Sequence, residues 1–512
     1  MDSAVLTQET PRISTKLWPP SKGTRVLFVE RITKNLTTPS IFSRKYGLLS
    51  LEEAEIDAKK IEESAFHHAN EHHKEELFSD GSSAVLLYAK KSSKFMLEVL
   101  RRGPTVLDNA TLEITRDLNQ KTVFDISGGR RSVIHTEDAE ELVKPLKSSS
   151  NSYSRICFSN TSFGVGAALV FQPVLVSLRS QLKEVDLSDF IASRPEIEAL
   201  EVMEIFASAL EGCQLRYLDL SNNALGEKGI RAFGSLLKSQ NNLEELYLIN
   251  DGISEDAARA VNELIPTTDK LKVLHFHNNM TGDTGAIFIS EIVRRSHLLE
   301  DFRCSSTRVG AEGGVQLAES LATCTHMRKL DLCDNIFGVE AGLALSKTLH
   351  NLVNIVEIYL SYLNLEDEGA EAVAIALKES APSLEVLDMA GNEITVKGGP
   401  ALASCISSKQ FLTKLNLAEN ELKDDGAILI AKALEEGHGQ LCELDMSCNL
   451  IRNAGAQYLA HAILNKPGFK KLNIDGNYIS DDGVDEVRDI LKGSPYILGP
   501  FDDNDPQGED TD

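Results

Sequence analysis

Two polar residues stand where they could act on a second molecule. Arg194 ends the stretch SDFIASR (188–194), directly after an alternating strand pattern, and Asn250 follows the apolar run of LYLINDG (246–252). A guanidinium or an amide at a strand end can bind or orient the polar groups of a partner. A plainer interpretation stays open for each residue. Arg194 would be solvated in a tolerated insertion, and Asn250 would satisfy backbone groups of a turn.

One histidine cluster, HHANEHH (67–73), has a spacing that suits a metal. His68 and His72 are one helical turn apart, but no carboxylate cage lies nearby in the sequence, and a solvated helix face explains them more simply. We therefore predict no metal site. The sequence also lacks a GxxxxGK[ST] phosphate loop, a GxSxG or HExxH motif and a Cys/His zinc frame, which excludes the corresponding classes of enzyme and switch.

Both polar residues belong to a repeated pattern, LxxLxLxxNxL, that we find twelve times between residues 153 and 479. Successive copies begin 28 or 29 residues apart, except for the step from 182 to 215, which takes 33 residues. The additional residues of that step follow the strand and include Arg194. Phe190 stands there in place of the usual Asn.

Each copy predicts a short strand followed by a helix. The LxL alternation places leucines on one face of a strand, and the Asn side chain can satisfy backbone groups where the chain leaves it. Apolar residues then recur every three or four positions, as in an amphipathic helix. We expect an α/β leucine-rich-repeat horseshoe of about 12 repeats, similar to ribonuclease inhibitor, with parallel strands on the concave side and helices on the convex side.

The remaining segments have other patterns. Helical periodicity and turn signals predict a small all-α domain over residues 16–110. We expect a disordered N-terminus over 1–15, a linker over 111–150, the repeats over 151–497 and a disordered acidic tail over 498–512, since residues 501–512 include six Asp and Glu.

Charge is unevenly distributed between these segments. Residues 1–110 contain 16 Lys and Arg against 15 Asp and Glu, a balance of +1. The remaining residues contain 36 against 62, a balance of −26, so the acidic excess lies entirely in the second part. An acidic surface argues against nucleic-acid binding and favours a basic protein partner.

Nothing in the sequence predicts insertion into a membrane. No run of 18 apolar residues is free of charge, and the N-terminus lacks the apolar core of a signal peptide. The eight cysteines form no CxxC or CxxxC pair, which fits reduced thiols in the cytoplasm.

The repeats and the stretches around Arg194 and Asn250 resemble the Ran GTPase-activating proteins. In that family a repeat ends in Ser-Asp, two apolar residues, two small residues and a required arginine, whose place Arg194 takes; the catalytically important asparagine corresponds to Asn250. The resemblance implies that the chain accelerates GTP hydrolysis on Ran and so helps to maintain the Ran gradient for nucleocytoplasmic transport and mitosis. Ran carries the GTP and Mg²⁺, so the chain needs no cofactor or substrate site of its own and is not itself an enzyme.

The resemblance also implies roles for single residues. Asn250 would orient the catalytic glutamine of Ran, and Arg194 would position Ran outside the phosphate site. We predict further Ran contacts at the strand ends, by Asp189, Asn223, Asp251 and Asn279.

The N-terminal part resembles the WPP domain of plant members of the family. Its signature is Trp18-Pro19-Pro20, followed by TRVLFVERITKNLTTPSIFSRKYG. The resemblance implies docking at the outer nuclear envelope through coiled-coil membrane proteins, and at the cell plate and mitotic structures during division. Trp18, Pro19 and Pro20 would form or support the docking surface. Trp18 could equally anchor the domain's own core.

Two other classes of function share the repeat geometry. A binding horseshoe of the ribonuclease-inhibitor type would form a tight complex without changing any GTPase rate. A non-catalytic scaffold at the nuclear envelope would tolerate the loss of Arg194 and Asn250.

Overall fold

The computed structural model describes residues 18–37, 49–75, 81–102, 122–128, 131–148 and 151–507. The chain forms two compact units, Met1–Leu118 and Asn119–Asp512. The segment 1–15, predicted to be disordered, lies outside the described residues. Within the described part of the chain, no helix combines the length and the apolar character needed to span a membrane.

The first unit is all-α, as predicted. Its described helices are α1 (Lys22–Thr37), α3 (Leu51–Glu75) and α4 (Ser82–Arg102). Trp18 is buried, stacks on Phe66 with ring centroids 5.2 Å apart, and meets the edge of Tyr88 at 5.5 Å. Its indole nitrogen donates to Asn70 Oδ1 at 3.3 Å. Trp18 therefore anchors this domain's own core, whereas Pro19 beside it is exposed.

A buried ion pair lies in the same core. Glu62 is 3% exposed and accepts two hydrogen bonds from the Arg25 guanidinium, at 2.7 and 2.8 Å, and one from the Tyr88 hydroxyl at 2.5 Å. Arg25 also lies over the ring of Phe66, 3.7 Å from its centroid. The charge of Glu62 is thus fully compensated inside the core, which is the condition for burying a carboxylate without a large cost.

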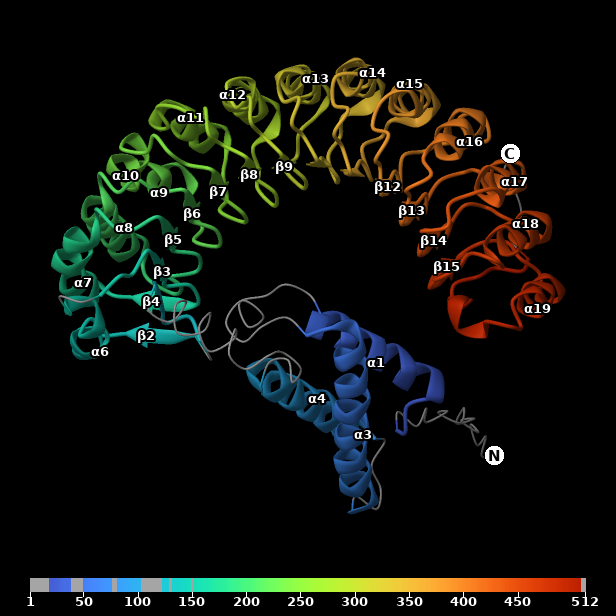
Figure 1. Cartoon of the computed structure of the whole chain (residues 1–512), viewed down its shortest axis with the longest axis horizontal. Coiled ribbons are helices and arrows are strands. Elements are labelled where there is room, and N and C mark those ends of the chain that lie inside the picture. Colours follow the sequence, from blue (N-terminus) through green and yellow to red (C-terminus); the bar gives the residue numbers. More distant parts are fainter. Residues whose placement is uncertain are drawn as a thin grey trace, which may run out of the picture. The chain divides into compact units, whose positions relative to one another are not determined.

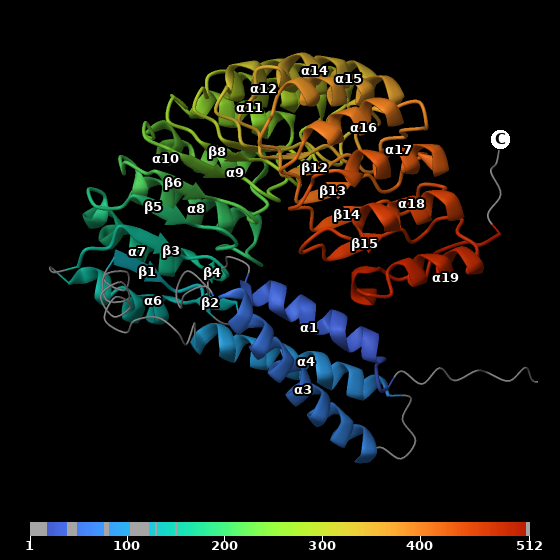
Figure 2. The ribbon, with the colours of Figure 1, turned by 45° about the vertical axis from the view of Figure 1, so that its right-hand side comes forward.

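The second unit is the predicted leucine-rich-repeat horseshoe. Figure 1 shows its strands along the inner side of the curve and its helices along the outer side, and Figure 2 shows the same two layers from another direction. All strands of the main sheet are parallel, and the sheet has 13 strands in the order β1-β3-β5, followed by β6 to β15 in sequence. A separate pair, β2 and β4, forms a small parallel sheet.

The bounds of the elements follow the repeat pattern. The strands are β1 (Val123–Asp125), β2 (Ser132–Ile134), β3 (Arg155–Cys157), β4 (Thr161–Phe163), β5 (Glu184–Asp186), β6 (Tyr217–Asp219), β7 (Glu245–Tyr247), β8 (Val273–His275), β9 (Asp301–Arg303), β10 (Lys329–Asp331), β11 (Glu357–Tyr359), β12 (Val386–Asp388), β13 (Lys414–Asn416), β14 (Glu443–Asp445) and β15 (Lys471–Asn473). The helices are α6 (Thr136–Leu142), α7 (Val165–Leu178), α8 (Glu196–Leu210), α9 (Gly226–Ala232), α10 (Gly234–Lys238), α11 (Glu255–Leu264), α12 (Gly282–Arg294), α13 (Ala311–Ser320), α14 (Gly338–Leu349), α15 (Glu366–Glu379), α16 (Gly399–Ser408), α17 (Lys423–Glu435), α18 (Asn453–Ile463) and α19 (Asp481–Ile490), with short 3₁₀ turns η1 (Pro145–Lys147), η2 (Leu321–Thr323) and η3 (Pro495–Ile497).

The strands are short because each serves only to align one repeat with the next. The middle residue of a strand, such as Leu246 in β7, is buried between sheet and helices and pairs in register with Leu274 of β8. Its two neighbours, Glu245 and Tyr247, are half-buried on the concave side. The period of two residues in the LxL pattern therefore sets which side chains enter the core.

The segment predicted to be a linker, 111–150, is wrongly assigned over 122–148. It supplies β1, β2 and α6, which extend the array beyond the first predicted repeat. Phe124, Ile134 and Leu146 are buried there and cover the apolar end of that repeat. An array of repeats needs such a terminal cover because each repeat alone leaves its faces open. Residues 103–121, 129–130 and 149–150 lie outside the described residues.

The tail predicted to be disordered, 498–512, is ordered as far as residue 507. Gly499 N–H donates to Leu472 O at 2.8 Å, and Asp505 N–H donates to Asn477 O at 2.9 Å. Asn504 pairs through its side chain with both backbone groups of Ile479, at 3.2 and 2.7 Å. These residues satisfy the open backbone edge of the last repeat. Residues 508–512 lie outside the described part.

Phe190 explains the departure of its repeat from the pattern. It is fully buried where most other repeats place Asn, and its ring lies 5.4 Å from that of Phe206 and 6.2 Å from that of Phe233. Phe158, Phe163 and Phe171 continue this aromatic cluster toward the N-terminal end. An aromatic core thus replaces a polar turn residue at this point of the array.

The buried ion pair of the first unit gives a testable prediction. Glu62→Gln leaves the Arg25 guanidinium without a compensating charge, and we expect it to destabilise this unit by about 2–4 kcal/mol. Trp18 is the only tryptophan in the chain and is buried in this unit, so its fluorescence during thermal unfolding measures the effect. Glu71→Gln is the matched control, because Glu71 lies on the same helix in an exposed pair with Lys74. Its expected effect is below about 0.5 kcal/mol. Equal shifts for the two variants would contradict the prediction.

Candidate functional site

A ladder of buried Asn side chains runs along the edge of the sheet where the parallel strands end. In one rung, Asn279 Oδ1 accepts hydrogen bonds from the backbone N–H groups of Asp251 and Ile253, both at 3.0 Å. Its Nδ2 donates to the carbonyls of Leu248 and Phe276, at 2.7 and 2.6 Å. One side chain therefore satisfies backbone groups of two repeats. We call the residues in this position the asparagine ladder: Asn223, Asp251, Asn279, Asn335, Asn392, Asn420, Asn449 and Asn477, none more than 6% exposed.

This burial corrects part of the predicted site. Asn223, Asp251 and Asn279 were predicted to contact a partner, but their side chains face the interior and are committed to the backbone. A partner could reach them only if the turns opened. They are structural residues of the ladder. Asp189 is different, since its side chain is 22% exposed and forms an ion pair with Arg131.

The residue before each ladder position points the other way. Asn222, Asn250 and Asn278 have positive φ angles of 64°, 54° and 58°, a left-handed conformation that Asn adopts more readily than most residues. All three side chains are exposed. We call them the exposed amide row. Asn250, predicted as catalytic, is therefore accessible, and its function is not the backbone satisfaction performed by the ladder.

The three amides of this row are hydrogen-bonded to one another. Asn250 Nδ2 donates to Asn222 Oδ1 at 3.1 Å, and Asn278 Nδ2 donates to Asn250 Oδ1 at 2.9 Å. Asn222 and Asn278 were not predicted as site residues from the sequence. The sequence does contain a sign of them, the pairs Asn222-Asn223 and Asn278-Asn279. The ladder uses only the second Asn of each pair, so the first is available for another role.

Arg194 lies in the loop between β5 and α8 and is held against the preceding repeat. Its Nε and Nη2 donate to the hydroxyl and the carbonyl of Ser162 at 3.0 and 2.9 Å, and its Nη1 donates to Glu198 Oε1 at 3.1 Å. The side chain is 16% exposed. Arg194 is thus a fixed cation at the surface rather than a freely solvated residue of an insertion.

Arg194 and the exposed amide row share one continuous edge. Arg194, Asp189, Asn222 and Lys228 line a hollow of about 660 Å³, together with Arg131. Asn222 in turn bonds to Asn250. The sequence-predicted Arg194 and Asn250 are therefore linked through Asn222 on one side of the horseshoe. Arg131 was missed because it lies in the segment predicted to be a linker, where no repeat pattern indicates its place.

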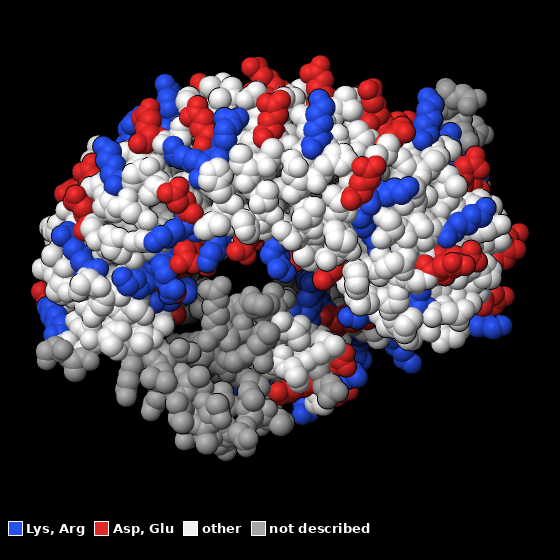
Figure 3. Space-filling view, turned by 45° about the horizontal axis from the view of Figure 1, so that its top comes forward, with Lys and Arg blue, Asp and Glu red and all other residues white. Residues whose placement is uncertain are grey.

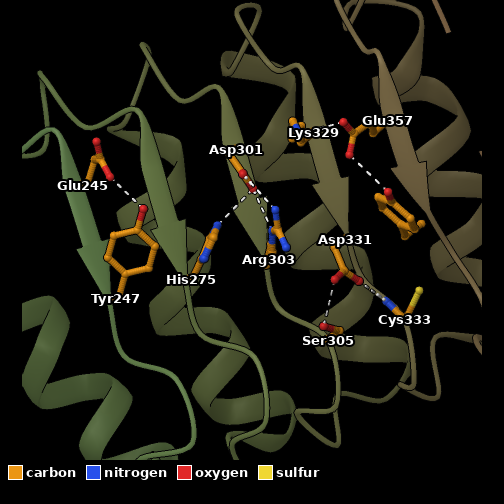
Figure 4. A network of polar contacts seen from close by, with 11 residues as sticks. Glu245, Tyr247, His275, Asp301, Arg303, Ser305, Lys329, Asp331, Cys333 and Glu357 are labelled. Atoms are coloured by element: carbon orange, nitrogen blue, oxygen red, sulfur yellow. Dashed lines mark hydrogen bonds and ion pairs between the residues drawn. The ribbon is translucent and has the colours of Figure 1, made fainter. Parts of the chain in front are cut away.

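The concave side next to this edge carries an internally paired network (Figure 4). Asp301 accepts hydrogen bonds from His275 Nε2 at 3.0 Å and from Arg303 Nε at 3.0 Å. Burial alone would raise the pKa of Asp301, but these hydrogen bonds and charges outweigh it and lower the pKa to about 2. Neighbouring pairs repeat the arrangement, with Tyr247 donating to Glu245 and Lys329 bound to Glu357.

Two carboxylates, Asp186 and Asp219, lie close together on the concave side near the first repeats. Burial, and the neighbouring carboxylate of Asp186, raise the pKa of Asp219 to about 6. The helical side differs, since charges of both signs are interspersed along it (Figure 3). The attraction of a basic partner by the acidic excess of this unit stays a prediction.

The histidine cluster shows no arrangement for a metal in the part of the chain that the structure describes. His68 Nδ1 lies 2.7 Å from the carbonyl of Ser64, within its own helix, and the ring of His68 lies beside Phe95. No group of three or more His, Cys, Asp or Glu side chains among the described residues could hold a metal ion.

Comparison with known proteins finds a family match in each of the two units. The WPP domain family matches residues 14–110, and a leucine-rich-repeat family matches 213–234, 380–403 and 408–431. RAN GTPase-activating protein 2 of Arabidopsis thaliana is 63% identical over 508 residues, covering 99% of this chain and 93% of that protein. The chain belongs to the Ran GTPase-activating proteins.

A second member of the family matches over the whole chain. RAN GTPase-activating protein 1 of the same plant is 62% identical over 510 residues, covering 100% of this chain and 94% of that protein. Among solved structures, an internalin from Listeria monocytogenes aligns with 12% identity and a TM-score of 0.45, over 75% of this chain and 88% of that one. The family resemblance predicted from the stretches around Trp18, Arg194 and Asn250 is confirmed.

One residue of the ladder is Asp251 rather than Asn, and its burial predicts that the stability of the repeat unit depends on pH. Asp251 is fully buried; its Oδ1 accepts from Asn223 N–H at 2.8 Å, whereas its Oδ2 has no hydrogen-bond partner. Burial raises the pKa of Asp251 well above its usual value of 3.8. The folded chain therefore binds a proton that the unfolded chain releases, and the free energy of unfolding falls as pH rises from about 3.8 through the folded-state pKa.

We accordingly expect Asp251→Asn to stabilise the repeat unit by about 1–3 kcal/mol at pH 8 and by less at pH 5. The amide removes the titrating carboxyl and restores the donor that other ladder residues have. Thermal unfolding followed by circular dichroism at both pH values measures the effect. Asp334→Asn is the matched control, because Asp334 is an exposed Asp with positive φ in the same sheet edge. Stabilisation that does not depend on pH would contradict the raised pKa.

Proposed function

We propose that this chain accelerates GTP hydrolysis on Ran and that Asn250 and Arg194 act on Ran from one edge of the repeat unit. Membership of the family supports the activity. The observation that carries the assignment of the site is that Asn250 is exposed and oriented while the neighbouring ladder residues are buried. Ran supplies GTP and Mg²⁺ in this proposal, so the chain completes the active site of Ran and needs no cofactor of its own.

Asn250 is the residue proposed to act on the reaction. Its amide has both a donor and an acceptor, which suits contact with the side-chain amide of a glutamine. An amide fixed before Ran binds would hold that glutamine, and with it the attacking water, in a reactive geometry. Orientation of this kind lowers the barrier because less freedom is lost in the transition state.

Arg194 is proposed to bind Ran outside the phosphate site. Its guanidinium is held by Ser162 and Glu198, so it would have to break three hydrogen bonds before it could extend toward a nucleotide. A fixed cation beside the hollow instead suits a carboxylate or carbonyl of a docked protein. This arrangement supports positioning and does not support an arginine inserted into the phosphate site.

The WPP domain is proposed to bring the protein to the nuclear envelope through coiled-coil membrane proteins, and to the cell plate and mitotic structures during division. Trp18 is committed to the core of the domain. Pro19, which is exposed, and Pro20, which is half-buried, are the members of the signature left to contact a partner.

The proposed activity is tested by single-turnover hydrolysis of GTP on Ran with the full chain. We expect Asn250→Ala to lower the maximal rate by about 100-fold, the loss that follows removal of one oriented polar group from a transition state. Asn250→Asp keeps the shape of the side chain but places a negative charge near developing negative charge, and it should be at least as impaired. Asn364→Ala is the control, because Asn364 is also exposed with positive φ but belongs to a distant repeat.

Arg194→Ala should act differently in the same assay. We expect it to raise the half-saturating concentration of activator about tenfold, since a hydrogen-bonding cation at the interface is lost. Its thermal midpoint must be measured as well, because Ser162 and Glu198 lose a partner. If the unchanged chain binds Ran without accelerating hydrolysis, the chain is a binding horseshoe. If Asn250→Ala and Arg194→Ala retain full activity, the proposed site is wrong.

The targeting proposal is tested with Pro19→Ala and Pro20→Ala in cells. We expect fluorescently labelled variants to lose enrichment at the nuclear envelope, while the purified proteins keep their helical content and the emission spectrum of the buried Trp18. Pro467→Ala, an exposed proline of the repeat unit, should leave targeting unchanged. Unfolding of the variants would assign the two prolines to the core, and normal targeting would exclude them from the docking surface.

A further inference from the structure

The hydrogen bonds of the exposed amide row all point in one direction. Asn278 donates to Asn250, and Asn250 donates to Asn222. An Asn side chain has two N–H donors and two acceptor lone pairs. The row uses one donor and one lone pair of Asn250, so one N–H and one lone pair remain for a partner, on sides of the amide that its neighbours define.

The backbone of each of these three Asn residues is held by an equivalent hydrogen bond to the following repeat. The N–H groups of Asn222, Asn250 and Asn278 donate to carbonyls of the following repeat, those of Ile249 at 2.8 Å, His277 at 3.2 Å and Ser305 at 2.9 Å. The three Cα positions therefore repeat with the spacing of adjacent strands. At this spacing, side chains in the same left-handed conformation can bridge from one repeat to the next.

A lone exposed Asn would lack this orientation. The terminal torsion of an Asn side chain has broad and roughly two-fold minima, so an unsupported amide exchanges the places of its oxygen and nitrogen at little cost. A reversed amide would present an acceptor to a partner that needs a donor. The hydrogen bonds of Asn250 with Asn222 and Asn278 hold it in one of the two orientations.

We propose that Asn278 and Asn222 are positioning residues for Asn250, with Asn278 selecting the orientation by its N–H and Asn222 accepting the bond that completes it. The inference rests on the proposed role of Asn250 in GTP hydrolysis on Ran. It adds that two residues outside the family motif determine how the Asn250 amide is presented.

The direction of the row provides a matched pair of variants. Asn222→Asp keeps an oxygen that accepts from Asn250 Nδ2, whereas Asn278→Asp replaces the donor to Asn250 Oδ1 by a second acceptor. Both substitutions add one negative charge next to Asn250, both preserve side-chain size, and Asp tolerates the left-handed conformation. A difference between them therefore reports the orientation of Asn250 rather than charge or folding.

The experiment is single-turnover hydrolysis of GTP on Ran as a function of the concentration of the full chain. We expect Asn278→Asp to lower the maximal rate about tenfold, the size of one oriented hydrogen bond, with a half-saturating concentration within about threefold of the unchanged chain. Asn222→Asp should keep the maximal rate within about threefold. Thermal midpoints of the two variants should agree, because both residues are exposed.

Each of the other possible results would contradict a different part of the proposal. Equal maximal rates for the two variants would overturn the positioning role, and impairment of Asn222→Asp alone would overturn the direction of the row. An effect of Asn278→Asp on the half-saturating concentration only would make Asn278 a binding residue instead. If the unchanged, folded chain does not accelerate hydrolysis, the proposed function itself fails. This outcome differs from failure of the positioning role alone, because there is then no accelerated rate with which the variants can be compared.

Discussion

The asparagine ladder is the constraint on which the rest of the repeat unit depends. Each Asn of the ladder accepts backbone N–H groups of one repeat and donates to carbonyls of that repeat and of its own, as Asn279 does. Buried backbone groups must be paired, so the ladder fixes where every strand ends. The residues before the rungs Asn223, Asp251 and Asn279 have positive φ angles and exposed side chains. The exposed amide row therefore lies directly beside the ladder.

The N-terminal end of the array shows what happens where the ladder stops. Phe190 takes the ladder position in an aromatic cluster, and the longer loop that follows carries Arg194. Because that loop is not confined by a rung of its own, it reaches back to Ser162 of the preceding repeat. The change from a polar ladder to an aromatic core thus provides the place at which a charged loop and a hollow can form next to the regular repeats.

Much of this arrangement could be predicted from the sequence because the repeat is periodic. The LxL alternation and the 28- or 29-residue step determine the strands, the helices and the curved parallel sheet. The repeat spacing places Asp251 at the ladder position and Asn250 one residue before it, but it does not show which of the two side chains is exposed. The distinction follows from the φ angle at Asn250 and from the partners of the ladder side chains.

The ends of the array were missed for a different reason. Residues 122–148 and 498–507 each occur once and have no repeat to be compared with, so a search for periodicity assigned them to a linker and a tail. Their function as end covers appears only from contacts such as those of Phe124 and Asn504. Arg131, which pairs with Asp189 beside the hollow, escaped attention for the same reason.

We propose that the exposed amide row presents the fixed amide of Asn250 to the active site of Ran while Arg194 holds Ran elsewhere. The most direct measurement is a crystal structure of the full chain bound to Ran with a non-hydrolysable GTP analogue. We expect the Asn250 amide within hydrogen-bond distance of the catalytic glutamine of Ran, with Asn222 and Asn278 still bound to it and Arg194 away from the phosphates. Arg194 in contact with the terminal phosphate, or Asn250 outside the interface, would contradict it.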